Sequence, residues 1–161
     1  MAATPKPKSV ADAQALQRLD HQLCFALYSS SLLMTKLYKP VLGPLGLTYP
    51  QYLVLLVLWE TDALAVGELG ARLYLDSGTL TPLLKRMQAN GLLARTRAAE
   101  DERRVIVTLS AAGRALRRKA SGVPLAVACA TGCELTEIGQ LTAQLQALRA
   151  SVAAHLDPAA P

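Results

Sequence analysis

The stretch of residues 75–87 constrains the fold of this chain most strongly, because it carries two patterns that belong on different faces of one helix. Its apolar residues recur at helical spacing, as in a helix held against a core: Leu80, Leu83, Leu84 and Met87. Its small hydroxyl and basic side chains fall largely elsewhere: Ser77, Thr79, Thr81, Lys85 and Arg86. Such a polar face can enter a DNA groove, where the helix N-terminus favours a phosphate. The stretch therefore predicts a DNA-reading helix.

The start of this helix also has a plainer interpretation. Asp76 or Ser77 would be an ordinary N-cap, and the threonines ordinary surface residues. Pro82 lies one turn inside, where its ring crowds the carbonyl of Gly78 and removes a backbone hydrogen bond. Taken alone, the stretch favours neither interpretation. We retain Asp76 and Gly78 among the candidate DNA-binding residues because of the segments on either side.

The flanking segments indicate a winged helix-turn-helix. Residues 66–73 form a short helical pattern, joined by a few residues to the next helix, as in a helix-turn-helix. Downstream, Asn90 and Gly91 form a helix stop signal, and two segments of strand character follow at 92–98 and 105–109. The fold class predicted is mainly α with a small β-hairpin wing.

Basic charge is concentrated over the same region. Residues 85–119 contain ten basic and three acidic side chains, so this window carries +7, whereas the whole chain carries +5. A solvated basic face would explain the charge but not its coincidence with the reading helix and the wing, which suits a polyanion. Arg103, near the wing tip, is expected to enter a minor groove, with Asp101 close enough in sequence to orient it.

Composition favours one domain with a covered apolar surface. The hydrophobic fraction of 52% and the mean hydropathy of +0.25 are high for a soluble monomer of 161 residues. The longest apolar run, 52–59, is far too short to span a bilayer, and residues 1–10 lack the apolar core of a secretory signal. We expect a cytoplasmic homodimer that does not interact with a membrane.

Helix start and stop signals give a coarse map of the chain. A flexible tail over 1–15 precedes a helix from about 16 to 42, and a second helix runs from 48 to near 61. After the wing, Ser110 caps a helix through Lys119, residues 122–124 interrupt it, and a last amphipathic helix spans about 136–155.

This map predicts a single domain, 1–161, with two functional parts. The winged unit that binds DNA is expected over 48–109. The helices before and after it, in 16–47 and 110–156, are the candidates for a two-fold dimer interface. A two-fold dimer would read palindromic double-stranded operator DNA.

Three cysteines, Cys24, Cys129 and Cys133, would not form a constitutive disulfide framework in a cytosolic chain. Cys24 lies in an apolar helical segment, where the usual interpretation is a buried, inert thiol. Cys129 and Cys133 are four residues apart and could share a helical face, but neither His21 nor His155 has ligand spacing to them. We expect neither a metal nor a cofactor, and find no hydrolase constellation or phosphate-binding glycine loop.

Five segments of the chain closely resemble the organic-hydroperoxide-responsive repressors (OhrR) of the MarR family: 23–28 (LCFALY), 36–40 (KLYKP), 47–53 (LTYPQYL), 73–85 (LYLDSGTLTPLLK) and 101–103 (DER). The resemblance covers nearly the whole chain. The winged-helix features indicate only the MarR family, whereas Cys24, Tyr38 and Tyr49 together make the resemblance specific.

The resemblance implies a dimeric repressor whose N-terminal cysteine is oxidised by organic hydroperoxides, so that DNA is released. Cys24 matches the reactive cysteine, and Tyr38 and Tyr49 match two tyrosines that hydrogen-bond it. Tyr38 lies about 21 Å from Cys24 along a continuous helix, at ~1.5 Å per residue, so it would have to reach the partner's cysteine. Tyr28, one turn after Cys24, is better placed within the chain, or only packs there.

Phenol hydroxyls that donate to sulfur would favour the thiolate, which attacks a peroxide bond to give a sulfenic acid. Phe25, Leu27 and Trp59 would favour lipophilic peroxides over hydrogen peroxide. The resemblance further implies that the sulfenic acid reacts in one of two ways. In one-Cys members it reacts with a small external thiol, and in two-Cys members it forms an intersubunit disulfide with a C-terminal cysteine. Cys129 matches the resolving position best and Cys133 is the alternative; the bond would displace the winged units on the operator.

Two other functions remain open at this point. The chain could be a MarR-type regulator released by a reversibly bound aromatic ligand, in which Cys24 only packs; Cys24→Ser would then leave the response intact. It could also be a thiol peroxidase that turns over substrate, but the DNA-reading unit would then be unexplained. We favour the peroxide-sensing repressor, which is not an enzyme.

Overall fold

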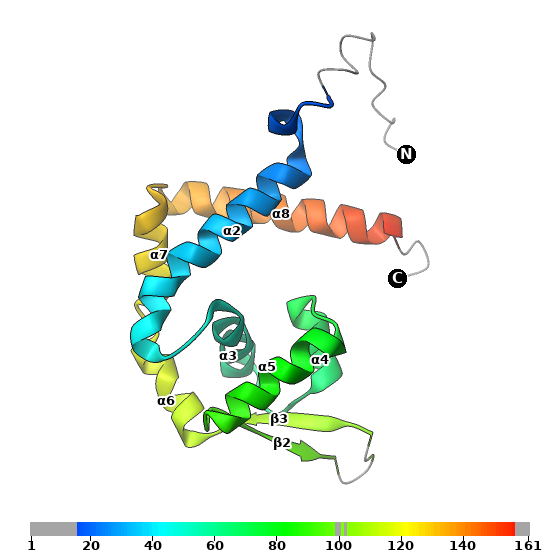
Figure 1. Ribbon diagram of the computed structural model, residues 1–161, viewed down its shortest axis with the longest axis vertical. Coiled ribbons are helices and arrows are strands. Elements are labelled where there is room, and N and C mark those ends of the chain that lie inside the picture. The colour runs from blue at the N-terminus through cyan, green and yellow to red at the C-terminus, as the bar shows by residue number, and fades with distance from the viewer. Residues whose placement is uncertain (1–15, 99–100, 102, 157–161) are drawn as a thin grey trace.

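The computed structural model describes residues 16–98, 101 and 103–156, so the expected tail and part of the wing tip lie outside the described residues. In chain order its elements are η1 (Leu19–His21), α2 (Leu23–Leu42), η2 (Gly43–Leu45), α3 (Tyr49–Glu60), β1 (Leu64–Ala65), α4 (Val66–Leu73), α5 (Ser77–Ala89), β2 (Leu93–Arg97), β3 (Val105–Leu109), α6 (Ala111–Lys119), α7 (Val123–Thr131) and α8 (Leu135–Leu156). Figure 1 shows α4, α5 and the strands at one end, with α2, α7 and α8 at the other.

The first long helix, α2, begins later than the sequence predicts. Gln22 is extended, and the residues before it form a turn and η1 rather than a helix from residue 16. The side-chain amide of Gln22 donates to the carbonyl of Leu16, which closes this turn. The predicted end at Leu42 is confirmed: η2 follows, and Gly46 then takes a left-handed conformation with φ of 68°.

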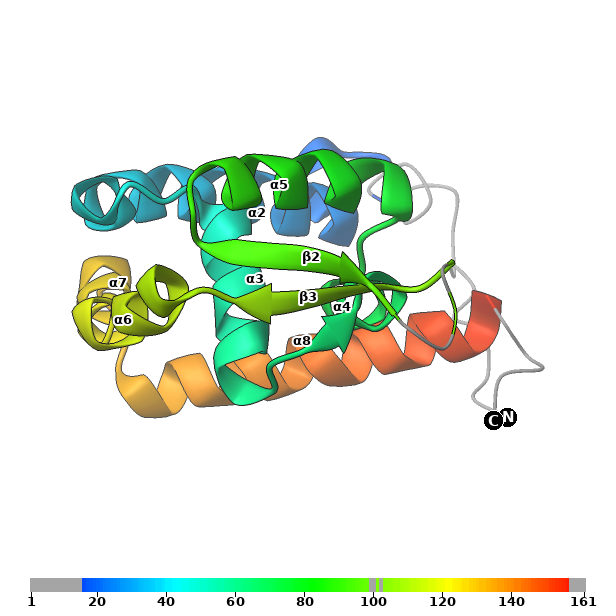
Figure 2. The ribbon, with the colours of Figure 1, turned by 90° about the horizontal axis from the view of Figure 1, so that it is seen from below.

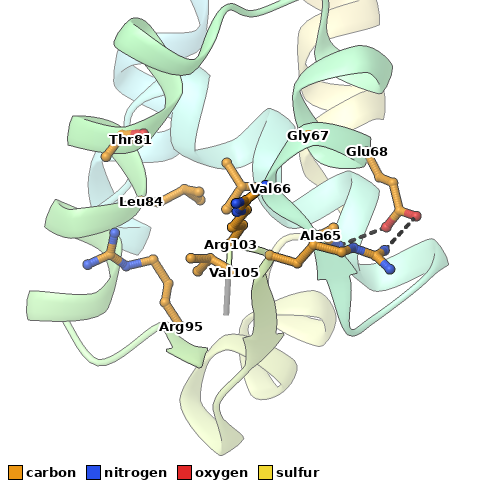
Figure 3. A pocket seen from close by; sticks show the side chains of 10 residues that line it. Ala65, Val66, Gly67, Glu68, Thr81, Leu84, Arg95, Arg103 and Val105 are labelled. Carbon is orange, nitrogen blue, oxygen red and sulfur yellow. Dashed lines mark hydrogen bonds and ion pairs between the residues drawn. The ribbon is translucent and has the colours of Figure 1, made fainter. Parts of the chain in front are cut away.

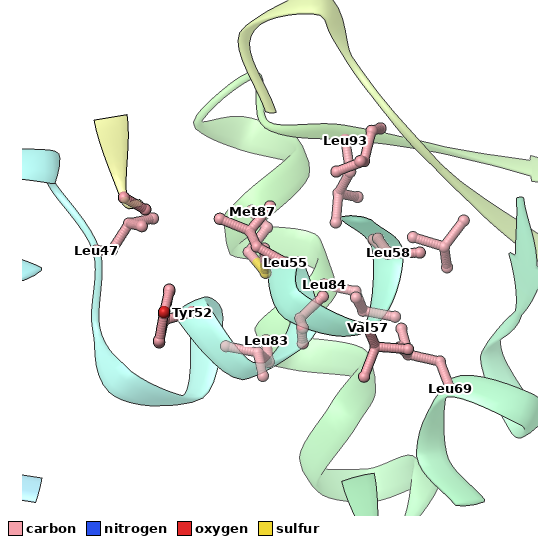
Figure 4. Close-up of a cluster of buried hydrophobic side chains, with 14 of the residues drawn as sticks. Leu47, Tyr52, Leu55, Val57, Leu58, Leu69, Leu83, Leu84, Met87 and Leu93 are labelled. Carbon is pink, nitrogen blue, oxygen red and sulfur yellow. The ribbon is translucent and has the colours of Figure 1, made fainter. Parts of the chain in front are cut away.

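The central helix α3 begins as its start signal predicts. The backbone N–H of Thr48 donates to Gln51 Oε1 at 2.9 Å, within a capping box, and Pro50 occupies the first turn. Half of the residues of α3 are buried, among them Leu55 and Leu58. The core that α3 shares with α4 and α5 is aliphatic (Figure 4), as the scarcity of aromatic residues indicates.

The winged unit contains one strand more than predicted. β3 is the central strand and pairs antiparallel with β2, with Arg95 opposite Val107, and with β1, with Leu64 opposite Val107. β1 has two residues, which is too short for any alternation to be recognised. The predicted hairpin is confirmed, and Gly91, with φ of 69°, ends the turn after α5 as its stop signal predicts.

Several hydrogen bonds and one close backbone contact connect the start of α6 to the ends of β3 and α3. Ser110 caps α6 as predicted, accepting from the backbone N–H of Gly113 at 3.0 Å. A side chain at Gly113 would meet the carbonyl of Leu92 at 2.1 Å, so only glycine fits there. Asp62 accepts from the backbone N–H of Leu109 at 2.8 Å, and the indole of Trp59 donates to Gly113 at 3.0 Å.

The C-terminal region differs from its prediction at the expected interruption. Pro124 lies in the first turn of a new helix, α7, which packs against α2. The last helix, α8, agrees with the prediction, and none of its residues is buried. Figure 2 shows α5 and α8 on opposite sides of strands β2 and β3.

The described residues include no single helix with the length and apolar character of a membrane span. Two consecutive helical segments, Leu23–Leu45 and Tyr49–Glu60, reach that length and apolar character only in combination, and they are bent by 70° relative to each other.

Candidate functional site

The recognition helix α5 begins at a tightly made cap. Asp76 accepts from the backbone N–H of Thr79 at 2.9 Å through one carboxylate oxygen and from its hydroxyl at 2.9 Å through the other. These bonds, the one from the backbone N–H most strongly, lower the pKa of Asp76 below its usual value. Both carboxylate oxygens are therefore engaged, so Asp76 acts as the N-cap that the plainer interpretation predicts.

The two faces of α5 separate as the sequence predicts. The four apolar residues of the stretch are buried, and most of its polar residues are exposed: Ser77, Gly78, Thr79, Lys85 and Arg86. Thr81 is half-buried. The helix continues through Pro82, whose ring is exposed to solvent, so the proline does not divide the helix.

A basic cavity of about 430 Å³ lies between α4, α5 and the wing (Figure 3). Arg95 of β2 donates through Nε to Gln88 of α5 at 2.7 Å, which ties the wing to the recognition helix. Arg104 of the wing lies 3.5 Å from Glu68 of α4, whose other carboxylate oxygen accepts from the backbone of Ala65 at 2.8 Å. The cavity is lined by Ala65, Val66, Gly67, Glu68, Thr81, Leu84, Arg95, Arg103, Arg104 and Val105.

Asp101 does not orient Arg103 in the way that its sequence position suggests. Its carboxylate accepts from the backbone N–H of Arg103 at 3.0 Å, and its carbonyl accepts from the backbone of Arg104 at 2.9 Å. Asp101 therefore holds the backbone at Arg103 and Arg104.

Arg95 is a candidate that the sequence analysis counted as charge but did not select. The period-2 alternation along β2 puts Leu93, Arg95 and Arg97 on one face. Leu93 is buried in the core, so Arg95 projects from the same face toward α5. This alternation could have identified Arg95 from the sequence, because Leu93 is the residue of the strand expected in the core and Arg95 lies on the same face.

The tyrosines of the expected sensor come together. The ring of Tyr38 lies 4.4 Å from that of Tyr49 and 6.1 Å from that of Tyr52, and Tyr52 in turn meets Trp59 edge-on at 6.1 Å. Burial raises the pKa of Tyr38, Tyr49 and Tyr52, so all three phenols are neutral hydrogen-bond donors at neutral pH. Tyr52 was missed, although it follows Tyr49 at helical spacing.

Cys24 is separated from these tyrosines by the length of α2. The helix is continuous from Leu23 to Leu42, which confirms that Tyr38 lies about 21 Å along it from the Cys24 of its own chain. Within the described chain Cys24 is exposed rather than buried. It lines a wide apolar groove of about 620 Å³ together with Leu23, Leu27, Tyr74, Leu145, Leu148, Arg149, Val152, Ala153 and Leu156.

The other expected sensor residues do not surround Cys24 within one chain. Trp59 lies between α3 and α6, where its indole donates a hydrogen bond to the carbonyl of Gly113. Tyr28 is 62% exposed, and Phe25 is also exposed. Neither lines the groove that contains Cys24.

The C-terminal cysteines do not share a helical face, although their spacing in the sequence would allow it. Cys129 lies in the last turn of α7, Gly132 ends this helix with φ of 70°, and Cys133 follows outside it. Both thiols are free and exposed. Among the described residues, no group of three or more His, Cys, Asp or Glu side chains could hold a metal ion.

The chain is similar to known transcriptional regulators. The family model described as transcriptional regulator SarA/Rot matches residues 36–119. The chain is 56% identical to the organic hydroperoxide resistance transcriptional regulator of Bacillus subtilis over 107 residues, which are 66% of this chain and 73% of that protein. It is 49% identical to the regulator TtmR of Methylorubrum extorquens over 133 residues, which are 83% of this chain and 68% of that protein.

Solved structures of AbfR, a protein of Staphylococcus epidermidis, are similar over most of their length. Reduced AbfR bound to DNA matches with a TM-score of 0.76 and 35% identity, covering 89% of this chain and 98% of that one. The disulfide form of AbfR matches with a TM-score of 0.59 and 36% identity, covering 87% and 98%.

Proposed function

Because the chain belongs to the organic-hydroperoxide-responsive transcriptional regulators of the MarR family, we propose that it is a dimeric repressor that releases operator DNA when an organic hydroperoxide oxidises Cys24. The observation that carries this proposal is the separation of Cys24 from the Tyr38–Tyr49 pair along one continuous helix. A thiol at one end and its donors at the other form a sensor only when two copies of the chain combine.

The DNA-binding part of the proposal rests on α5 and the wing. The N-terminus of α5 presents exposed hydroxyl groups, and the helix dipole there favours a phosphate. Arg95, Arg103 and Arg104 add positive charge beside it. We assign to this face the predicted DNA contacts, with Asp76 holding the helix start rather than touching DNA.

The dimer is supported by apolar surface that the chain leaves uncovered. The N-terminal half of α2 exposes Leu23, Leu27 and Leu32, and α8 exposes Leu141 and Leu145. Contiguous surface of this kind marks a protein interface. A second copy is the occupant that would also bring Tyr38 and Tyr49 of one subunit to Cys24 of the other, by a two-fold axis.

The proposed chemistry begins at the Cys24 thiolate, which neutral phenols of the partner subunit stabilise by donating hydrogen bonds. The sulfur attacks the terminal peroxide oxygen, the O–O bond breaks, and the alkoxide takes a proton and leaves as an alcohol. Cys24 is left as a sulfenic acid. A thiol of Cys129 of the partner subunit then attacks this sulfur, so that a disulfide forms and water leaves; Cys133 remains the alternative.

The conformation of this chain is consistent with the DNA-bound state of the proposed switch. It is more similar to reduced AbfR bound to DNA, with a TM-score of 0.76, than to the disulfide form, with a TM-score of 0.59. We therefore propose that the arrangement described above is that of the DNA-binding repressor, without the disulfide.

The test adds one equivalent of cumene hydroperoxide to the reduced wild type and to Cys24→Ser, Cys129→Ser and Cys133→Ser. Products are followed on a non-reducing gel, by intact mass and by release of bound DNA. We expect a covalent dimer that is lost in Cys24→Ser and in one C-terminal variant, which names the resolving cysteine. Unchanged DNA release by Cys24→Ser would overturn the proposal and favour a ligand-released regulator.

A further inference from the structure

Tyr74 lies in the turn before the recognition helix, and its side chain also lines the groove that contains Cys24. It is the residue directly after α4, and α5 is capped by Asp76 two residues later. Its side chain lines the apolar groove with Cys24 and Leu27 of α2 and with residues of α8. Although it is a large aromatic residue, it is 67% exposed. Burial in the core therefore does not explain its position.

The backbone at Tyr74 is held in a conformation that a tyrosine seldom adopts. Its φ and ψ are 55° and 38°, in the left-handed region where a residue with a Cβ is strained. The turn is fixed on both sides: the backbone N–H of Leu75 donates to Gly70 at 3.0 Å, and a side chain at Gly70 would meet the carbonyl of Leu75 at 2.8 Å. The ring is thus rigidly joined to the start of α5.

The exposed ring of Tyr74 has a partner on the last helix. The guanidinium carbon of Arg149, on α8, lies 4.5 Å from the ring centroid, within the range of a cation–π contact. No residue of α8 is buried, so this helix lacks the deep packing that would otherwise fix it on the winged unit. The Arg149–Tyr74 contact joins α8 directly to the helix-turn-helix.

We propose that Arg149 and Tyr74 are positioning residues that transmit the redox state of the cysteines to the recognition helix. This inference rests on the proposed function. With the cysteines reduced, the stacked pair holds α8 against the turn and keeps α5 in the orientation that binds DNA. When a disulfide displaces the C-terminal region, the pair separates and the turn is no longer held.

The geometry of α8 makes it a suitable lever. It begins just beyond Cys133, and Arg149 lies about 21 Å along it from Leu135, at ~1.5 Å per residue. A tilt of about 10° at the first turn would therefore carry Arg149 roughly 4 Å from its place. Because the guanidinium already lies 4.5 Å from the ring centroid, this displacement would carry it beyond the range of a cation–π contact, which is about 6 Å.

The experiment compares two disrupting variants, Tyr74→Leu and Arg149→Gln, with two matched controls that keep the contact, Tyr74→Phe and Arg149→Lys. The probe is a fluorescent DNA duplex that the reduced wild type selects from a random pool. Affinity is measured by anisotropy before and after one equivalent of cumene hydroperoxide, and disulfide formation is measured on a non-reducing gel. Far-ultraviolet circular dichroism during heating establishes that every variant is folded.

We expect reduced Tyr74→Leu and Arg149→Gln to bind the duplex about five- to twentyfold more weakly, since two contacts are lost per dimer. Tyr74→Phe and Arg149→Lys should stay within about twofold of wild type. Disulfide formation should be equally fast in all, so oxidation produces a smaller further loss in the disrupting variants. The double variant should be no weaker than either single one, because both remove the same contact.

Wild-type affinities in Tyr74→Leu and Arg149→Gln, or additive losses in the double variant, would overturn the inference. The outcome is separate from that of the proposed function. If cumene hydroperoxide fails to oxidise Cys24 in the wild type, the peroxide-sensing proposal fails. The affinities of the reduced variants and their controls would still decide whether the pair positions α5.

Discussion

The winged unit buries its apolar surface within the chain, whereas the helices α2 and α8 leave much of theirs exposed. In the winged unit the apolar faces of α4, α5 and β3 are buried against α3, and the polar ends of its helices are capped within the chain. Helix α8 has no buried residue, and the N-terminal half of α2 exposes a row of leucines. The first region can fold on its own contacts, whereas the second requires a partner.

The largest expected effect is a loss of stability in the winged unit. Leu84 of α5 is 1% exposed, so Leu84→Ala should lower the free energy of unfolding by about 3 kcal/mol through lost transfer energy and a residual cavity. Lys85→Ala, at the exposed neighbouring position, should change it by less than about 0.5 kcal/mol. Urea titrations at several protein concentrations should give the same difference for Leu84→Ala. A difference that vanishes at high concentration would contradict the self-contained core.

A negative charge introduced on α8 should instead weaken the association of two chains into a dimer. Leu145, at 39% exposure, lies in the apolar groove, and Leu145→Glu would bury a carboxylate in a dimer interface. We expect the dimer dissociation constant to rise at least roughly tenfold in sedimentation experiments. Gln140→Glu, exposed on the same helix, is the control and should leave it nearly unchanged. If Leu145→Glu remains as dimeric as the control, α8 does not form the interface.

A wing substitution should weaken DNA binding without affecting the dimer. Arg103→Ala removes one positive charge beside the recognition helix of each subunit, so binding should fall several-fold and the slope of log K against log salt should decrease by about 2 per dimer. Arg117→Ala, on α6 beside Asp62, should leave that slope unchanged. Equal slopes for Arg103→Ala and the wild type would remove Arg103 from the DNA-binding face.

The smallest expected effect concerns the buried tyrosines and alkaline pH. Burial raises the pKa of Tyr52, so the folded state holds this proton more tightly than the unfolded chain does. Its contribution to stability is fully present below the unfolded pKa of about 10 and is lost as the pH rises above that value. In Tyr52→Phe, urea midpoints should therefore fall less steeply between neutral and strongly alkaline pH. An unchanged dependence would assign the loss to Tyr38 and Tyr49.

Local sequence signals determined where most elements begin and end. Thr48, Asp76 and Ser110 were recognisable as caps, and Asn90 with Gly91 as a stop, because each acts through backbone groups within a few residues. The same reasoning separated the buried from the exposed face of α5. It also fixed the distance from Cys24 to Tyr38, since the rise per residue of a helix is constant.

Only the tertiary structure decided the features that depend on contacts distant in sequence. β1 exists because Leu64 pairs with Val107, and α7 exists as a helix packed on α2 rather than as a simple interruption. The cation–π contact of Arg149 with Tyr74 likewise joins residues that are far apart in the sequence. The sequence by itself determined the winged unit, because helical and strand periodicity and capping act locally, and its family resemblance named the candidate sensor residues. Which of those residues meet within one chain was decided by the packing of α2 against α3, which brings Tyr38 to Tyr49.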